Sequence, residues 1–95
     1  MNYRTTASFD HAFAKLPKEH RALFLSAVRE HLLPALAAGA HRGDAPWPRR
    51  LRTHKIGDAY SLTWSFASPE GRALFVIGHG AVLTWIAVGY HDIYG

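Results

Sequence analysis

The hydrophobic residues change their spacing midway along the chain, and this change limits the fold more than any other feature. Phe9, Phe13 and Leu16 stand at i, i+4 and i+7, the spacing of one helix face, and a second such stripe runs through residues 24–32. In residues 60–66, large apolar side chains alternate with Ser and Thr, which is the period of a strand. Helices that precede strands in this way predict an α+β fold.

Prolines and capping residues divide the helical half into two helices. We expect Ser8 or Asp10 to cap the first helix, and Pro17 to end it or to begin the second one. Pro34 lies within the apolar pattern of the second, longer helix, so a kink or an end is expected near Leu33. The sequence therefore predicts an N-terminal hairpin of two helices.

The strand-rich half contains several segments that turn-forming residues separate. We expect strands at 60–66, 72–78 and 82–89, with weaker candidates at 51–56 and 3–6. The connections have hairpin length, so the sheet should be mostly antiparallel, with four or five strands. The last long segment is apolar on both faces except for one threonine, and it should be the most central strand. The helices and this sheet are expected to form a single domain, residues 1–95.

Composition removes several classes of protein from consideration. The 95 residues include no cysteine, which excludes disulfide scaffolds, cysteine-based zinc sites and thiol catalysis. No apolar run reaches the ~20 residues that a membrane-spanning helix needs. Residues 1–6 turn polar at once and lack the apolar stretch of a signal peptide. We therefore expect a cytoplasmic protein that does not contact a membrane.

The seven histidines form no recognisable metal motif. The pattern His-Glu-x-x-His is absent, and His11, His20 and His31 lack the i, i+4 spacing that brings two ligands together on one helix face. We interpret each histidine of the helices and loops as a surface residue. Neither a metal ion nor another cofactor is expected.

Positive charge is concentrated in the middle of the chain. The formal net charge is +4, and residues 41–55 carry five Lys or Arg side chains against one Asp. Such a cluster attracts phosphates or an acidic partner, and a solvated basic loop without any partner is the alternative. Trp47, which stands between two prolines, should cover the core rather than stack on a base. The candidate RNA- or phosphate-binding residues are Arg49, Arg50, Arg52, His54 and Lys55.

Polar side chains with catalytic potential follow the last expected strand. His91 can transfer a proton near neutral pH, and Tyr94 can donate a hydrogen bond or stack on a base. Asp92 could orient the imidazole or cap the chain end, and Arg72 could hold a phosphate with its forked guanidinium group. This set suits phosphodiester chemistry on RNA, which needs proton transfer and a cation for the developing charge. The alternative is a chain end that merely covers the sheet edge.

Three short segments, taken in order, point to one known family. They are residues 13–17 (Phe-Ala-Lys-Leu-Pro), 71–75 (Gly-Arg-Ala-Leu-Phe) and 83–94 (Leu-Thr-Trp-Ile-Ala-Val-Gly-Tyr-His-Asp-Ile-Tyr). In this order they resemble the RelE/ParE superfamily of bacterial type II toxins. The His-Asp-x-Tyr ending resembles that of one branch of RelE-like mRNA interferases. The resemblance implies two helices packed on a curved, mostly antiparallel sheet.

The resemblance also implies an activity and partners. RelE-like members cleave mRNA on the ribosome without a metal ion and so inhibit translation, and an antitoxin protein wraps around them and blocks their site. Arg72 matches the family's arginine near the scissile phosphate, and His91 and Tyr94 match residues with acid–base or positioning roles. Asp92 matches a neighbouring motif position, to which we give a supporting role. We therefore expect an endoribonuclease whose partners are an antitoxin, the ribosome and mRNA.

A second class of function stays open. The polar side chains of residues 60–66 are hydroxyls, where RelE-like nucleases carry Lys, Arg or Glu, and Gly71 stands where that family usually has an aromatic residue. A hydroxyl group is a poor base and does not neutralise a phosphate. The alternative is therefore a toxin that binds without catalysis, similar to the ParE-like inhibitors of DNA gyrase, or an inactive homologue that still binds an antitoxin.

Overall fold

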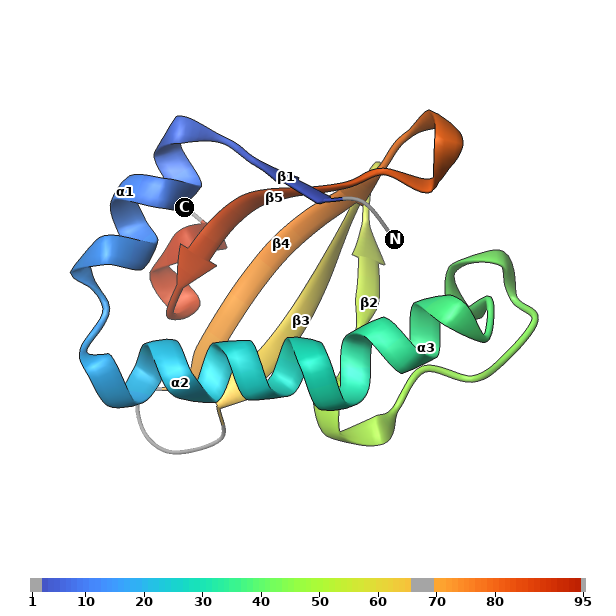
Figure 1. The fold of residues 1–95 in the computed structure, drawn as a ribbon, viewed down its shortest axis with the longest axis horizontal. Helices are drawn as coiled ribbons and strands as arrows, with labels where there is room; N and C mark the ends of the chain where they lie inside the picture. Colours follow the sequence, from blue (N-terminus) through green and yellow to red (C-terminus); the bar gives the residue numbers. More distant parts are fainter. Residues whose placement is uncertain (1–2, 66–69, 95) are drawn as a thin grey trace.

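A five-stranded sheet forms the centre of the molecule (Figure 1). The structure, a computed structural model, describes residues 3–65 and 70–94. The strands are β1 (Tyr3–Thr5), β2 (His54–Ile56), β3 (Ala59–Ser65), β4 (Gly71–Ile77) and β5 (Leu83–Gly89). Their order across the sheet is β1-β5-β4-β3-β2. β1 runs parallel to β5, and the other neighbouring pairs are antiparallel.

The α+β fold and the mostly antiparallel sheet agree with the prediction, but two details of the strands differ. The strand expected at 51–56 begins only at His54, because residues Arg49–Leu51 form a 3-10 turn that buries Leu51 in the core. The prediction for the central strand was wrong, because β4 and not β5 lies in the middle. Phe66, which we placed on the apolar face of its strand, lies outside the described residues.

The most apolar strand, β5, lies one place away from the centre. Its outer neighbour is β1, which contributes three residues only. The register of β5 with β4 shifts between Trp85 and Ala87, so that Ile86 has no direct partner on β4. An apolar sequence on both faces therefore does not require a central position in the sheet.

Thr6 links the sheet to the first helix, α1 (Ala7–Lys15). Its hydroxyl donates a hydrogen bond to the carbonyl oxygen of Ile86 (3.2 Å) and accepts one from the backbone N–H of Phe9 (3.1 Å). Thr6 is therefore the N-cap of α1, and the prediction that Ser8 or Asp10 caps this helix was wrong. The cap residue must be extended, and its pairing with β5 holds Thr6 in that conformation.

Pro17 directly precedes the second helical segment, and Pro34 follows a π-helical turn within it. α2 (Lys18–Ala27) starts directly after Pro17, as predicted. It continues through a π-helical turn, Val28–Leu32, into α3 (Leu33–Ala37), so Pro34 does not end the helix. Pro34 has no N–H to donate and its ring would clash with the preceding turn, and the wider π-helical turn relieves that clash. The irregularity expected near Leu33 is thus a change of hydrogen-bond pattern.

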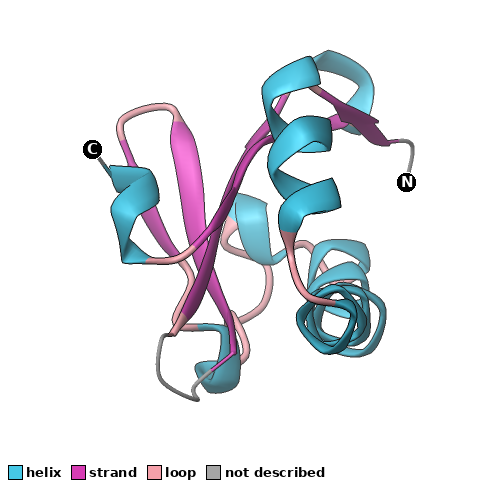
Figure 2. Cartoon of the chain, turned by 90° about the vertical axis from the view of Figure 1, so that its left-hand side faces the viewer, coloured by secondary structure: helices cyan, strands magenta, loops and turns pink. Residues whose placement is uncertain are grey.

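Both α1 and α2 cover the same face of the sheet, where α1 packs on β5 and α2 packs on β3 (Figure 2). The two helices form a corner and not a closely paired antiparallel hairpin (Figure 1). Arg21 stabilises this corner, because its Nη1 donates to the carbonyl oxygens of Ala14 (3.3 Å) and Leu16 (3.2 Å). These carbonyl groups lie at the end of α1 and lack partners within the helix.

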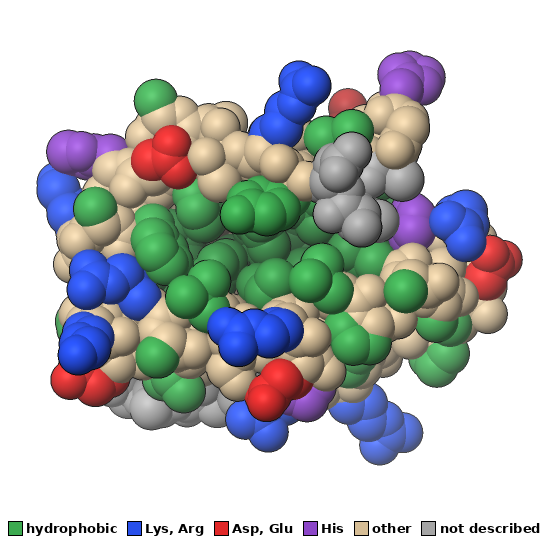
Figure 3. Space-filling view, viewed as in Figure 1, with side chains coloured by type: hydrophobic (Ala, Val, Ile, Leu, Met, Phe, Trp, Pro, Cys, Tyr) green, Lys and Arg blue, Asp and Glu red, His purple; other side chains and the backbone are tan. Residues whose placement is uncertain are grey.

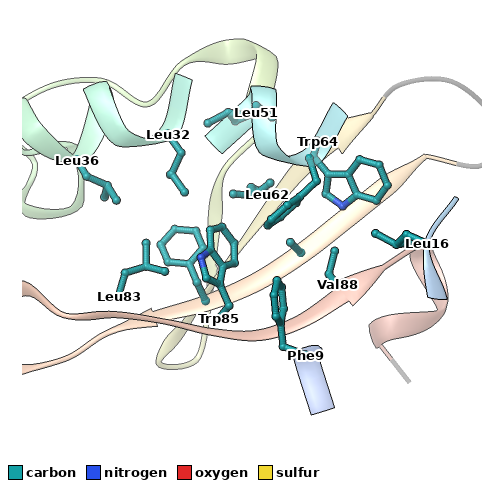
Figure 4. Packing of buried hydrophobic residues seen from close by; sticks show 14 residues of the cluster. Phe9, Leu16, Leu32, Leu36, Leu51, Leu62, Trp64, Leu83, Trp85 and Val88 are labelled. Carbon is teal, nitrogen blue, oxygen red and sulfur yellow. The ribbon is translucent and has the colours of Figure 1, made fainter. Parts of the chain in front are cut away.

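Side chains from the helices and the sheet meet in one hydrophobic cluster (Figure 4). The ring centroid of Trp85 lies 5.0 Å from that of Phe24 on α2 and 5.4 Å from that of Phe75 on β4. Trp47 packs against this cluster, and its ring centroid lies 5.6 Å from that of Tyr60. The expectation that Trp47 covers the core is confirmed.

A close contact between β3 and β4 requires glycine at position 71. A Cβ atom on Gly71 would lie 2.4 Å from the indole ring of Trp64. The indole is held there because its Nε1 donates a hydrogen bond to the carbonyl oxygen of Arg72 (2.8 Å). The ring of Trp64 thus fills the space that an aromatic side chain at position 71 would need. This explains why glycine, and not an aromatic residue, stands at this position.

We expect Gly71→Ala to lower the free energy of unfolding by about 1–3 kcal/mol, the usual cost of overpacking a core. The added methyl group must displace a buried indole ring that packs against α2. Urea denaturation of the wild type and the variant measures this change. Gly78→Ala is the matched control, because a Cβ atom there would meet only the carbonyl oxygen of Val82, at 3.9 Å. Equal stability of the two variants would contradict the proposed contact.

Candidate nucleic-acid interface

The side of the sheet opposite α1 and α2 carries the helical turn at the end of the chain (Figure 2). Residues that pair directly in neighbouring antiparallel strands point to the same side of a sheet. Leu62, Ala73 and Phe75 point into the core, so the residues that alternate with them point away from the helices. We call this side the outer face; by register it carries His54, Ser61, Thr63, Arg72, Leu74, Ala87 and Gly89.

The hydroxyl groups of β3 are buried, although the alternating pattern predicted a strand with one exposed face. Ser61, Thr63 and Ser65 are 1%, 3% and 5% exposed. β3 has neighbours on both edges, and Arg72 of β4 stands directly opposite Thr63. On the outer face, Ser61 and Thr63 are therefore shielded from solvent.

Arg72 is a largely buried cation on the outer face. Its side chain is 17% exposed, and its Nη2 lies 2.6 Å from Oε2 of Glu70. Its Nη1 is buried and has no hydrogen-bond partner among the described residues. The guanidinium group therefore keeps donors that a ligand with several acceptor oxygens, such as a phosphate, can engage.

Two residues of the basic segment share the outer face with Arg72. Nη1 of Arg52 lies 3.8 Å from the same oxygen of Glu70. Arg52 has a left-handed backbone (φ +46°), and its carbonyl oxygen accepts a hydrogen bond from Nδ1 of His54 (3.2 Å). His54 stands opposite Ser61. Glu70, which sequence reasoning missed, thus brings Arg52 close to Arg72.

The other basic candidates lie away from this cluster. Arg49 and Arg50 are exposed in the 3-10 turn that precedes Arg52. Lys55 pairs with Tyr60 and lies on the helix side of the sheet, where its Nζ is 5.9 Å from the centroid of the tyrosine ring. Arg49 and Arg50 can therefore extend the positive surface, whereas Lys55 does not share the face of Arg72.

The chain end returns to the outer face beside Arg72. Gly89 stands directly opposite Arg72, and a Cβ atom on Gly89 would lie 2.8 Å from Cγ2 of Ile93. Ile93 belongs to a 3-10 turn, His91–Tyr94, that contacts β4 as well as β5. Asp92 supports this turn, since its Oδ1 accepts a hydrogen bond from the N–H of Tyr90 (3.2 Å). The backbone thus brings the His91–Tyr94 turn next to Arg72, and the side chains of His91 and Tyr94 lie outside the described part of the structure.

Tyr90 anchors the start of that turn on the helix side. Its hydroxyl group and Nδ1 of His20 on α2 lie 2.5 Å apart in a hydrogen bond. The ring of Trp64 lies next to both, with centroids 5.8 Å from His20 and 6.1 Å from Tyr90. His20 is therefore a half-buried packing residue, and the prediction of a surface histidine was wrong. A contact between residues 70 positions apart leaves no signal in the spacing of the sequence.

An apolar groove lies on the helix side of the molecule, between α1, α2 and the β1 edge of the sheet. It encloses about 370 Å³. Figure 3 shows hydrophobic side chains gathered in this hollow, with Lys and Arg side chains and some Asp or Glu side chains around it. Tyr3, Leu25 and Leu33 line the groove although they are 70%, 45% and 41% exposed. Arg29 contributes a cation to the lining.

Neither a metal centre nor a membrane span is found in the part of the chain that the structure describes. Among residues 3–65 and 70–94, no three His, Asp or Glu side chains stand together in a way that could hold a metal ion. None of the described helices has the length and apolar character needed to cross a bilayer.

The arrangement of the sheet and helices is that of the RelE fold. No protein-family profile and no curated protein sequence matches the chain. Among solved structures, a chain in the crystal structure of the intact E. coli RelBE toxin–antitoxin complex is similar, with a TM-score of 0.57. The two chains are 16% identical, and the similarity covers 94% of each. At this identity the likeness establishes a shared fold, and the fold expected from the sequence resemblance is confirmed.

Proposed function

We propose that this protein is the toxin of a bacterial type II toxin–antitoxin system and that it cleaves mRNA on the ribosome in the cytoplasm. The observation that carries the proposal is the position of Arg72, a largely buried cation directly opposite Gly89 and beside the His91–Tyr94 turn. The RelE fold, which the chain shares with a chain of the RelBE toxin–antitoxin complex, supports the same function.

The proposed reaction is an internal attack within RNA. The 2′-oxygen of one nucleotide attacks the adjacent phosphorus, the bond from phosphorus to the 5′-oxygen breaks, and a 2′,3′-cyclic phosphate and a free 5′-hydroxyl result. The proton of the 2′-hydroxyl leaves to a base, and the 5′-oxygen gains a proton. In this proposal Arg72 binds the phosphate as charge develops on it, His91 transfers a proton, and Tyr94 positions the substrate. Asp92 supports the turn that carries both.

The basic segment supports binding of the RNA backbone. Arg52 lies beside Arg72, His54 shares its face, and Arg49 and Arg50 are exposed nearby in the chain. Each Lys or Arg that contacts a phosphate releases counterions, which makes binding weaker as salt rises. The mRNA is therefore the proposed substrate and the ribosome the partner on which it is cut, and no cofactor is needed for the chemistry.

A toxin that binds without catalysis is the alternative, and one observation favours it. The outer face of β3 presents buried hydroxyl groups, which supply neither a base nor a positive charge. A ParE-like inhibitor of DNA gyrase or an inactive antitoxin-binding homologue would need neither. Two parallel assays distinguish the two functions. The wild-type chain is added to ribosomes that translate an mRNA and, separately, to a gyrase supercoiling reaction. Cut mRNA supports the interferase, and loss of supercoiling with intact mRNA supports the alternative.

We also propose that the antitoxin binds the apolar groove with an amphipathic, acidic helix. Contiguous exposed apolar surface marks a site for a partner, and a helix places apolar side chains at i, i+3, i+4 and i+7 along such a groove. Arg29 in the lining and the Lys and Arg side chains around the hollow favour a partner with acidic residues flanking that apolar stripe.

Leu25→Glu is expected to weaken antitoxin binding about thirtyfold or more, equivalent to at least ~2 kcal/mol for a central interface residue. The substitution puts a carboxylate into an apolar groove that faces an acidic partner. Titration calorimetry with the antitoxin that neutralises this chain in cells measures the change. Leu23→Glu is the control, because Leu23 lies on the same helix and is 43% exposed but does not line the groove. Equal affinity for both variants would rule out this docking site.

A further inference from the structure

Two arginines of the outer face converge on one carboxylate oxygen. Nη2 of Arg72 lies 2.6 Å and Nη1 of Arg52 lies 3.8 Å from Oε2 of Glu70. The side chain of Arg72 is 17% exposed and that of Glu70 is 38% exposed, so the pair lies at the boundary between the interior and solvent. An anion already occupies the position at which the two cations meet.

The carboxylate does not satisfy Arg72 completely. Nη1 of this side chain is buried and has no hydrogen-bond partner in the described part of the chain. A buried donor without a partner costs free energy, and a phosphate has enough oxygens to take both Nη1 and Nη2 in a forked contact and still reach a second cation. Arg72 therefore keeps a donor that one phosphate oxygen can take while another oxygen takes Nη2.

We propose that Glu70 occupies a phosphate-binding site and competes with the phosphate for Arg72 and Arg52. The carboxylate holds the two guanidinium groups close together, and a phosphate of a nucleic-acid strand displaces it. Glu70 thereby sets the affinity of the outer face for phosphate and keeps that affinity low. The identity of the ligand as RNA rests on the proposed function, whereas competition for an anion site does not.

If Glu70 positions Arg72 and does not compete with the ligand, its removal changes the affinity in the opposite direction. If the carboxylate only orients Arg72 for its ligand, its removal leaves the guanidinium group less well placed, and binding weakens. If the carboxylate competes with the ligand, its removal strengthens binding, because a like charge next to a bound phosphate is lost. The sign of the change therefore separates a competing group from a positioning group.

The test measures the affinity of the wild type and Glu70→Gln for a 2′-O-methyl RNA strand, which lacks the attacking hydroxyl and cannot be cut. We expect Glu70→Gln to bind the strand about tenfold more tightly. The gain stays modest because solvent screens the partly exposed carboxylate that is removed. The slope of affinity against salt should also steepen by up to about one unit, because one more cation becomes available to the strand. Fluorescence anisotropy at several salt concentrations gives both quantities.

Two further variants trace the effect to its cause. Asp44→Asn removes the same charge from an exposed ion pair, in which Oδ2 of Asp44 lies 3.1 Å from Nε of Arg42. It should change the affinity less than twofold, because a surface ion pair contributes little free energy. Adding Arg72→Ala to Glu70→Gln should abolish the gain. Circular dichroism checks folding, and Glu70→Ala replaces the glutamine variant if that variant does not fold.

The outcomes separate this proposal from the proposed function. Equal or weaker binding by Glu70→Gln, or an equal gain in Asp44→Asn, overturns the competing role of Glu70. Tighter binding supports that role even if the wild-type chain leaves mRNA intact on the ribosome, and such a result would overturn only the nuclease.

Discussion

Replacing Arg72 with alanine is expected to slow mRNA cleavage about 10²–10³-fold, the usual cost of removing one group that stabilises developing charge. Arg72 is the largely buried cation of the outer face, and it stands opposite Gly89, where the His91–Tyr94 turn returns to the sheet. Ribosome binding should fall much less, because the exposed Arg49 and Arg50 lie outside the Arg72–Glu70 cluster and remain able to contact phosphates. Single-turnover cleavage and ribosome cosedimentation measure the two effects separately.

Arg72→Lys is the informative companion of this variant. Lysine keeps the positive charge but loses the fork that holds two phosphate oxygens, so cleavage should recover only in part. Arg72→Ala removes the ion pair with Glu70 and Arg72→Lys alters its geometry, so thermal unfolding must show that both variants remain folded. An equal loss of cleavage and ribosome binding in Arg72→Ala would contradict the role of Arg72 at the scissile phosphate.

His91→Ala is expected to slow cleavage about 10²–10⁴-fold, the range for the loss of a group that transfers a proton. The turn that carries His91 begins beside Gly89 and is anchored by Tyr90, whose hydroxyl group bonds to His20. The core is built from other residues, so we expect folding to survive. The rate of cleavage on programmed ribosomes, measured together with the unfolding temperature, tests both statements.

His79→Ala is the matched control for the histidine variant. His79 is exposed in the turn that connects β4 to β5, at the opposite end of β5 from Gly89, and its loss should leave cleavage unchanged. A toxin that acts only by binding does not transfer protons, so it would tolerate His91→Ala as well as His79→Ala. The same pair of variants therefore distinguishes the nuclease from the gyrase-inhibitor alternative.

The class of fold could be predicted because it depends on local periodicity. The helical stripe of Phe9, Phe13 and Leu16 and the alternation after Tyr60 each reflect one buried face, and both elements form where the pattern indicates. The failures have a different origin. Thr6 caps α1 because β5 holds it in place, and the order of the strands depends on which edges are free, so neither is encoded by neighbours in the sequence.

The candidate site was predictable only in part, for a related reason. Arg72 could be identified as a candidate site residue from the sequence of residues 71–75. Its position opposite Gly89 follows from the pairing of β4 with β5. Glu70 stands two residues before Arg72, a spacing that places two residues of an extended chain on one side, so a local signal for it existed. The contact of His20 with Tyr90 joins α2 to the chain end and has no such signal.

The central claim is ribosome-dependent cleavage of mRNA, and primer extension in a purified translation system tests it most directly. Wild-type chain, Arg72→Ala and His91→Ala are added to the same mRNA, with and without ribosomes. The account predicts cuts that appear only with ribosomes and only with the wild-type chain. Intact mRNA in the presence of ribosomes and folded wild-type chain would contradict it.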